Sequence, residues 1–269
     1  MSFEASGIEV FPLVPFLVGF CLASVTTSAG VSGAFLLLPF QVSVLGFTAP
    51  GVTSTNLLYN VISTPGGIFR YRQQGDFDRH LVRAIASGAV PGVVGGAVLR
   101  VTVFEDPADF KAFVGFALLP LAAGLFVRAF RNSTSADAHA ESFAEVPVIL
   151  LAAVAGTIGG IYGISGGSII APALVGVFRL PVRRVAAAAL VATFITSVTG
   201  VVSFEVIAFV KDIPNARPDW VLATLFGLGG ALGGLTGARL SVFLQDRKLE
   251  LLLGVLAMAL AVTYISPLL

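Results

Sequence analysis

Two glycine- and serine-rich stretches, TSAGVSGAFLLLP at residues 27–39 and GGIYGISGGSIIAP at residues 159–172, interrupt the two longest apolar blocks of the chain. These blocks cover about 10–45 and 146–178, and each holds more than thirty residues. As one straight helix, either block would extend about 50 Å, whereas about 20 residues cross the ~30 Å of hydrocarbon in a bilayer. Glycine and serine near the middle of each block favour a break there. We therefore expect each block to form two half-helices.

The composition is that of a membrane protein. Of the 269 residues, 56% are hydrophobic and 12% are charged, which is about half the charged share of a soluble domain. The net charge of +1 provides no basic surface for nucleic acid. The only cysteine is Cys21, both histidines lie in polar segments, and the apolar blocks contain no cluster of His, Asp and Glu. We therefore expect no metal, no cofactor and no enzymatic activity.

The other six apolar blocks have the ordinary length of a membrane span. The pattern predicts an all-α polytopic membrane protein in which the two interrupted blocks re-enter on one side and the other six cross. A polar linker at 132–145 separates a first half, 1–131, from a second half, 146–269. The eight blocks cover about 10–45, 49–69, 80–101, 110–128, 146–178, 182–210, 218–240 and 249–266.

The two halves are similar to each other in sequence. Each contains a Gly-x-Ser-Gly motif, starting at Gly30 and at Gly163, with a proline six residues after the motif ends. Further matches follow in the same order. Asn60, Thr64 and Gly67 fall opposite Thr193, Ser197 and Gly200, respectively. Gly92, Gly95 and Gly96 fall opposite Gly230, Gly233 and Gly234, and Gly115 falls opposite Gly254. Their order and near-constant offset predict an internal duplication. Three crossings in each half, an odd number, would give the two halves opposite orientations in the membrane. Such inverted repeats are found in many secondary transporters.

Lysine and arginine predict the orientation. With the interrupted blocks re-entrant, 12 of the 16 basic residues fall on one side, which the positive-inside rule assigns to the cytoplasm. The four on the outer side are Arg100, Lys111, Lys211 and Arg217. We expect a multi-pass protein of the cytoplasmic membrane with both termini outside.

The order of these motifs adds a further indication. The first break is followed by Leu-Pro-Phe, then by TSTNLLYN at 53–60, GDFD at 75–78 and the second break, GISGGS, at 163–168. Together they resemble the TauE/SafE family of sulfite and organosulfonate exporters over about residues 12–266. The resemblance implies export of a small sulfur-containing or organic anion and does not identify the ligand. The chain has no Gly-x-x-x-x-Gly-Lys-Ser/Thr motif for ATP, so we expect a secondary transporter, with an anion channel of the same architecture as the alternative.

The half-helices suggest where an anion would bind. An anion inside hydrocarbon must exchange its water shell for protein donors. The N-terminal ends of the second half-helices offer backbone N–H groups and a partial positive charge. We expect these two ends to face each other near the midplane and to hold the anion. The alternative is that the glycine and serine residues only let the helices pack closely, as small residues do in membranes. The candidate binding residues are Ser32, Gly33, Ser165, Gly166, Gly167 and Ser168.

Polar residues of the second and sixth blocks are further candidates. Asn56 and Asn60 are four residues apart and share a helix face, so their amide groups could donate to an oxyanion or could join helices. Thr193 falls opposite Asn60 in the second half. Glu205 lies inside an apolar run and is a candidate for coupling transport to protons. The alternative for Glu205 is a place near the outer headgroups.

Overall fold

The computed structural model describes residues 2–3, 5–28, 32–73, 78–130, 143–164, 166–240 and 246–268. Helices make up nearly all of this part of the chain, which confirms the prediction of an all-α polytopic membrane protein. The exception is a short antiparallel hairpin of β1 (Ser2–Phe3) and β2 (Ile8–Glu9). Phe3 and Ile8 of this hairpin are buried among residues of the main core. The sequence analysis did not predict the hairpin.

The helices follow the apolar blocks of the sequence. The first half contains α1 (Leu13–Ser28), α2 (Ala34–Ser43), α3 (Gly51–Ser63), α4 (Pro65–Gln73), α5 (Arg79–Thr102) and α6 (Pro107–Phe130). The second half contains α7 (Glu145–Tyr162), α8 (Gly166–Gly176), α9 (Val182–Val210), α10 (Trp220–Leu240) and α11 (Asp246–Ile265), with short 3-10 turns η1 (Pro214–Ala216) and η2 (Ser266–Leu268). The two interrupted blocks correspond to the pairs α1–α2 and α7–α8.

Within the described residues, six helical segments are long and apolar enough to cross a membrane: α5, α6, α7, α9, α10 with the turn before it, and α11. The sequence analysis also expected six crossings, but it counted the block at 49–69 and treated 146–162 as a half-helix. In the structure the block at 49–69 is divided into α3 and α4 at Thr64, because Pro65 has no N–H to continue the helix. Neither α3 nor α4 alone has the length of a span.

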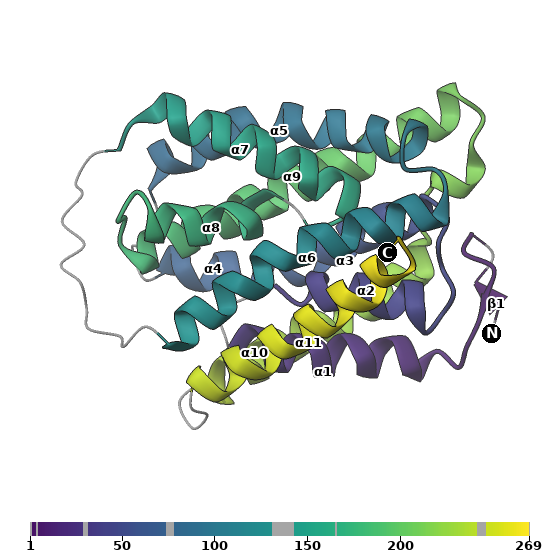
Figure 1. Ribbon diagram of the computed structural model, residues 1–269, viewed down its shortest axis with the longest axis horizontal. Coiled ribbons are helices and arrows are strands. Elements are labelled where there is room, and N and C mark those ends of the chain that lie inside the picture. Colours follow the sequence, from purple (N-terminus) through teal and green to yellow (C-terminus); the bar gives the residue numbers. More distant parts are fainter. Residues whose placement is uncertain are drawn as a thin grey trace.

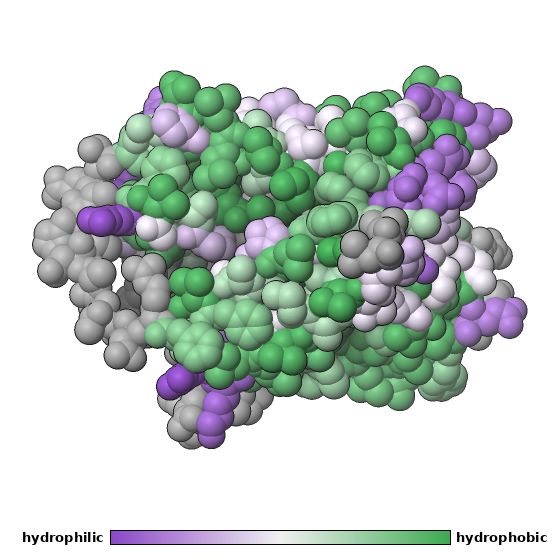
Figure 2. Space-filling view, in the orientation of Figure 1, coloured by the Kyte–Doolittle hydropathy of each residue, from purple (hydrophilic) through white to green (hydrophobic). Residues whose placement is uncertain are grey.

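The outer surface agrees with a bilayer location. Figure 2 shows a face that is hydrophobic over most of its length, with hydrophilic residues gathered toward the two ends of the long axis. Large apolar side chains point outward along the helices, among them Leu150, Phe130 and Phe209, the last of which is 78% exposed. Exposure of this kind is unfavourable in water and suits contact with lipid tails.

The path of the chain makes each interrupted pair a hairpin. Leu174, near the end of α8, lies in one buried cluster with Val148 at the start of α7 and Leu81 at the start of α5. The second pair therefore returns to the end of the molecule from which it started. In Figure 1 both termini lie at the opposite end from the start of α7 and the end of α6.

At the end of the molecule where α5, α7 and α9 begin, charged side chains join the three helices. Asp78 accepts hydrogen bonds from the N–H groups of His80 and Leu81 and pairs with Arg184, while His80 pairs with Glu145. Burial by itself raises the pKa of Asp78, but the hydrogen bonds from Leu81 and Arg184 and the charge of Arg184 outweigh it and lower the pKa. The ionised carboxylate therefore stabilises the fold above about pH 4, and this contribution is lost as the pH falls through the lowered pKa.

Two helix pairs pack with unusually close backbones. α5 lies along α7 and α1 lies along α10, and both contacts extend over most of the helix length. A Cβ atom on Gly88, Gly92 or Gly96 of α5 would come within 2.0–2.3 Å of a carbonyl oxygen of α7. A Cβ on Gly229, Gly233 or Gly237 of α10 would come within 2.0–2.3 Å of a carbonyl oxygen of α1. We call these two contacts the glycine seams; only glycine leaves room for them.

The seams fix a register that the sequence comparison missed. The oxygens facing the α5 glycines belong to Ile149, Ala153 and Thr157, and those facing the α10 glycines belong to Phe16, Phe20 and Ser24. Ile149, Ala153 and Thr157 follow Phe16, Phe20 and Ser24 by 133 residues each. Gly163 follows Gly30 by the same offset. In this register Gly92 corresponds to Gly233, so the sequence match of Gly92 with Gly230 was wrong by three residues. Glycine-rich helices contain several near matches, and only packing selects among them.

The seams give a stability prediction with a control one residue away. Gly96→Ala places a methyl group against the Thr157 carbonyl and pushes α5 from α7, whereas a Cβ on Gly95 meets nothing within 4 Å. We expect Gly96→Ala to destabilise the protein by about 1–3 kcal/mol. Gly95→Ala should be neutral or slightly stabilising, because alanine favours helix. Thermal unfolding in detergent measures both; equal melting temperatures for the two variants would contradict the seam.

Candidate functional site

Two helix breaks face α3 from different halves of the chain. The first break separates α1 from α2 at residues 29–33, and the second separates α7 from α8 at residues 163–165. Residues 29–31, the candidate Ser165 and the side chain of the candidate Ser168 lie outside the described residues. The remaining candidates are placed, and most of them lie around these two breaks.

Gly163 forms the turn of the second break. Its φ of 89° lies in the left-handed region, where a side chain is strained, and a Cβ there would also lie 2.8 Å from the carbonyl oxygen of Thr53. Its N–H donates to the Gly159 carbonyl at 2.7 Å, which is the last regular hydrogen bond of α7, and its left-handed conformation then ends the helix. Its own carbonyl oxygen is no longer part of the helix ladder and must find donors elsewhere.

Asn60 of α3 touches both breaks. Its Oδ1 accepts a hydrogen bond from the Ser32 hydroxyl at 3.3 Å, and its Nδ2 donates to the Gly163 carbonyl at 3.4 Å. The Ser32 hydroxyl also accepts from the N–H of Ala34, the first residue of α2, at 3.3 Å. The structure therefore brings the candidates Ser32 and Asn60 together beside the second break. The hydrogen bonds that connect Asn60 to Ser32 and to Gly163 are long.

Asn56, one turn earlier on α3, is held more firmly. Its Nδ2 donates to the carbonyl oxygens of Ala34 at 2.9 Å and Gly163 at 3.1 Å, so both amide hydrogens are used. Its Oδ1 accepts from the Nε2 of Gln41 on α2 at 3.3 Å. Asn56 thus bridges α2, α3 and the second break in this conformation. The Oε1 of Gln41 is buried and has no partner among the described residues.

The glycines at the two breaks lie in close contact with neighbouring helices. A Cβ on Gly33 would be 2.6 Å from the Tyr59 hydroxyl, and one on Gly166 would be 3.1 Å from the backbone of Gly156. A Cβ on Gly167 would be 2.5 Å from the Oγ1 of the candidate Thr193. The start of α8 therefore lies directly against α9 at Thr193, and packing contributes to the choice of glycine at all three positions.

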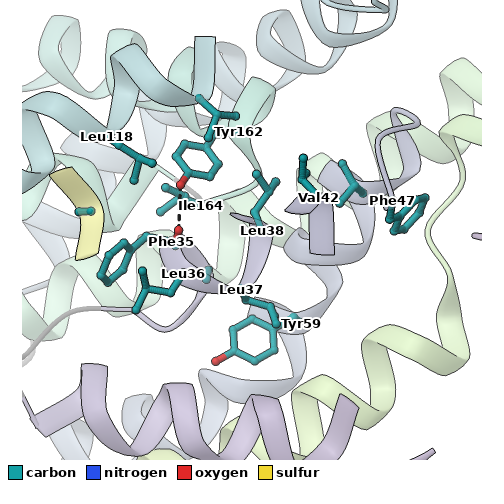
Figure 3. Close-up of a cluster of buried hydrophobic side chains, with 14 of the residues drawn as sticks. Phe35, Leu36, Leu37, Leu38, Val42, Phe47, Tyr59, Leu118, Tyr162 and Ile164 are labelled. Atoms are coloured by element: carbon teal, nitrogen blue, oxygen red, sulfur yellow. Dashed lines mark hydrogen bonds between the residues drawn. The ribbon is translucent and has the colours of Figure 1, made fainter. Parts of the chain in front are cut away.

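The polar residues of α3 are closed off from solvent. All residues from 53 to 60 are buried, and Asn56 and Asn60 have no exposed surface. Figure 3 shows how the end of α7 reaches α2: the Tyr162 hydroxyl donates to the Phe35 carbonyl oxygen at 2.8 Å, beside Ile164. The two breaks are therefore joined to each other both through α3 and directly.

Side chains of α3 neutralise the carbonyl end of α7. A helix C-terminus carries partial negative charge, which opposes an anion bound nearby. The Oγ1 of Thr53 donates to the Ile161 carbonyl at 2.9 Å, and the two asparagines donate to Gly163. Donors on these oxygens reduce the negative potential beside the N-terminal end of α8. The arrangement thus weakens the opposition of the α7 C-terminus to negative charge at the break.

The sequence analysis assigned Arg100 only to the outer side, and the structure buries it completely. Its Nε donates to the Thr53 hydroxyl at 3.2 Å, its Nη2 donates to the Thr48 carbonyl at 2.9 Å, and its Nη1 donates to the Phe104 carbonyl. Arg100 follows Gly96 by four residues and so continues the buried face of α5 that carries the glycine seam. That spacing is the signal that could have predicted its burial.

Glu205 does not join the site. It lies 12 residues after Thr193 on α9, which is about 18 Å along the helix. Its side chain is 34% exposed, accepts a hydrogen bond from Trp220 at 3.2 Å and lies 3.7 Å from the Nε of Arg217. These surroundings agree with the alternative expectation for Glu205, a position near the outer headgroups. No group of three or more His, Cys, Asp or Glu side chains comes together within the described residues.

Comparison with known proteins identifies the family. The family model described as "Sulfite exporter TauE/SafE" matches residues 15–264. The chain belongs to the TauE/SafE family. Two curated relatives from Bacillus subtilis are the probable membrane transporter proteins YjnA, 25% identical over 88% of this chain and 93% of the relative, and YunE, 22% identical over 88% and 91%. No solved structure matches the chain.

A third TauE/SafE relative, a probable membrane transporter protein of Xylella fastidiosa, is 25% identical over 91% of this chain and 90% of its own length. The family match and these relatives make the chain a multi-pass membrane transporter and not an enzyme. The resemblance found in the sequence is confirmed.

The bridging contacts of Asn56 predict its effect on stability in this TauE/SafE protein. Asn56→Ala removes the donor to the Ala34 carbonyl, the shorter of the two amide donors to the Gly163 carbonyl and the acceptor of Gln41, which we expect to cost about 1–3 kcal/mol. We expect the melting temperature in detergent to fall by about 5 °C or more. The control is Thr196→Ala, because buried Thr196 donates only within α9. A shift no larger than that of Thr196→Ala would show that the bridge contributes little.

Proposed function

We propose that this transporter is a secondary transporter that exports a small anion, such as sulfite, an organosulfonate or a small carboxylate, and binds it between the two helix breaks. The observation that carries the proposal is the contact of Ser32, Asn60 and Gly163, which joins the first break to the second. An anion bound there would meet the N-terminal ends of both α2 and α8. The description of the family as sulfite exporters supports the class of substrate.

The residues of the site would have two kinds of role. Asn56 holds the frame, because its amide is fully used by backbone carbonyls and Gln41. Ser32 and Asn60 would bind the ligand, since their hydrogen bonds of 3.3–3.4 Å are long and can be exchanged for bonds to an oxyanion. The N-terminal turn of α8, with Gly166, Gly167 and the neighbouring Ser165 and Ser168, and Thr193 beside it would complete the site.

The proposal includes transport by alternating exposure of this site. The buried position of the α3 asparagines corresponds to a closed state. The two glycine seams have matching spacing and offset, which supports two inverted repeats at 1–131 and 146–269 that can tilt relative to each other. A small linker at 132–145 would join them on the cytoplasmic side.

Flux through purified protein tests the proposal. We expect proteoliposomes containing the protein to take up sulfite, thiosulfate or sulfoacetate with saturation, at rates far below those of a channel. Any anion that binds should also raise the melting temperature by mass action. Single-channel currents would establish the alternative, an anion channel. Neither flux nor thermal stabilisation with any of these anions or with small carboxylates would reject the proposed substrate class.

Charge at Ser32 gives the sharpest test of the site. Ser32→Asp keeps an oxygen that can accept from the Ala34 N–H, so α2 remains capped, but it adds negative charge where the anion would bind. We expect the Kd for sulfite to rise at least tenfold, about 1.4 kcal/mol. Ser32→Asn is the matched neutral control and should change the Kd by less than about threefold. Similar affinities for the two variants would place Ser32 outside the site.

Cysteine labelling tests the proposed orientation. Cys21→Ala removes the only thiol. In that background, Pro107→Cys lies in the exposed first turn of α6 and Arg79→Cys lies in the exposed first turn of α5. We expect an impermeant thiol reagent to label the Pro107 position in intact cells, and the Arg79 position only after lysis. The reverse pattern would invert the orientation, and labelling of both from outside would exclude the proposed topology.

A further inference from the structure

Arg100 is a buried cation whose direct partners are all neutral. Its guanidinium has no exposed surface and donates to one hydroxyl and two backbone carbonyls. The ring of Phe110 lies over it, with the ring centroid 3.7 Å from the guanidinium carbon. A charge taken out of water is costly unless an opposite charge accompanies it.

No carboxylate lies within ion-pair distance of Arg100 among the described residues. By contrast, Arg184 pairs with Asp78, and Arg217 lies 3.7 Å from Glu205. The acidic group that acts electrostatically on Arg100 is Glu105, which is exposed in the loop after α5. Arg100 therefore retains much of its positive potential inside the protein.

The Thr53 hydroxyl links Arg100 to the second break. Thr53 accepts from Arg100 and donates to the Ile161 carbonyl, two residues before Gly163. Asn56 follows Thr53 by three residues on the same face of α3. Arg100, Thr53 and the break thus form one hydrogen-bonded line that runs from the end of α5 to the proposed site.

We propose that Arg100 is the residue that selects for negative charge in this transporter, because it supplies the positive charge behind the second break for an oxyanion bound there. This inference rests on the proposed function and names the group that determines its substrate class. Each terminal nitrogen of Arg100 carries two hydrogens and donates one to a backbone carbonyl. Because both terminal nitrogens are held by backbone carbonyls, Arg100 would act through its charge from a fixed position and not by contact with the ligand. That charge favours anions such as sulfite, a sulfonate or a carboxylate and disfavours cations.

The test compares charge with mere packing at this position. Arg100→Lys keeps the charge, and Arg100→Gln keeps a donor without charge. In sulfite uptake by proteoliposomes, we expect Arg100→Gln to raise the KM at least tenfold and Arg100→Lys to raise it less than about fivefold. Sulfite should raise the melting temperature of the wild type and of Arg100→Lys, but not of Arg100→Gln. Lys211→Gln, at an exposed cation after α9, is the control and should match the wild type.

A second variant covers the case in which Arg100→Gln does not fold. Glu105 is exposed, so Glu105→Gln should fold, and it removes the negative charge that offsets Arg100. We expect the KM for sulfite to fall about two- to fivefold at low ionic strength. Asp212→Asn, at another exposed acid after α9, should leave it unchanged.

The outcomes separate this inference from the proposed function. A wild-type KM in folded Arg100→Gln, or an unchanged KM in Glu105→Gln, would overturn the role of Arg100 while leaving anion transport intact. A melting temperature that falls equally in both Arg100 variants, with unaltered stabilisation by sulfite, would make Arg100 a packing residue only. A wild-type protein that neither transports nor binds any tested anion would overturn the proposed function and this inference together.

Discussion

The carbonyl oxygen of Gly163 has to find donors inside the protein, because the helix stops there at a buried position. The amides of Asn56 and Asn60 meet this requirement. In doing so they bring α3 to the second break, and Ser32 brings the first break to the same place. The position of the site follows from the need to satisfy one interrupted backbone.

The glycine seams provide the close packing that surrounds this centre. Because α5 approaches α7 and α1 approaches α10 at backbone distance, each of the two hairpins α1–α2 and α7–α8 is packed against a longer helix. α3 and α9 also lie against each other. Leu57 packs on Gly200 and Leu190 packs on Gly67, so corresponding residues of the two halves exchange equivalent contacts.

The polar groups divide into fixed and exchangeable ones. Asn56 bonds two backbone carbonyls at 2.9–3.1 Å, and replacing those bonds would break the frame. The longer bonds of Asn60 connect groups from both breaks and can be replaced at less cost. Arg100 donates to Thr53, three residues before Asn56, and so lies next to the fixed part.

Sequence alone determined the class of the protein, because hydropathy and segment length are local properties and a bilayer admits few structures. It also placed the helix breaks within residues 27–33 and 159–168, where the structure has them at 29–33 and 163–165, and it named Ser32 and Asn60 as candidates, which the structure brings into contact. Only the tertiary structure decided that Asn56 is a bridge, that Arg100 is buried, and that Gly92 corresponds to Gly233. These depend on which helix faces meet, and side-by-side packing is set by the whole chain rather than by any segment of it.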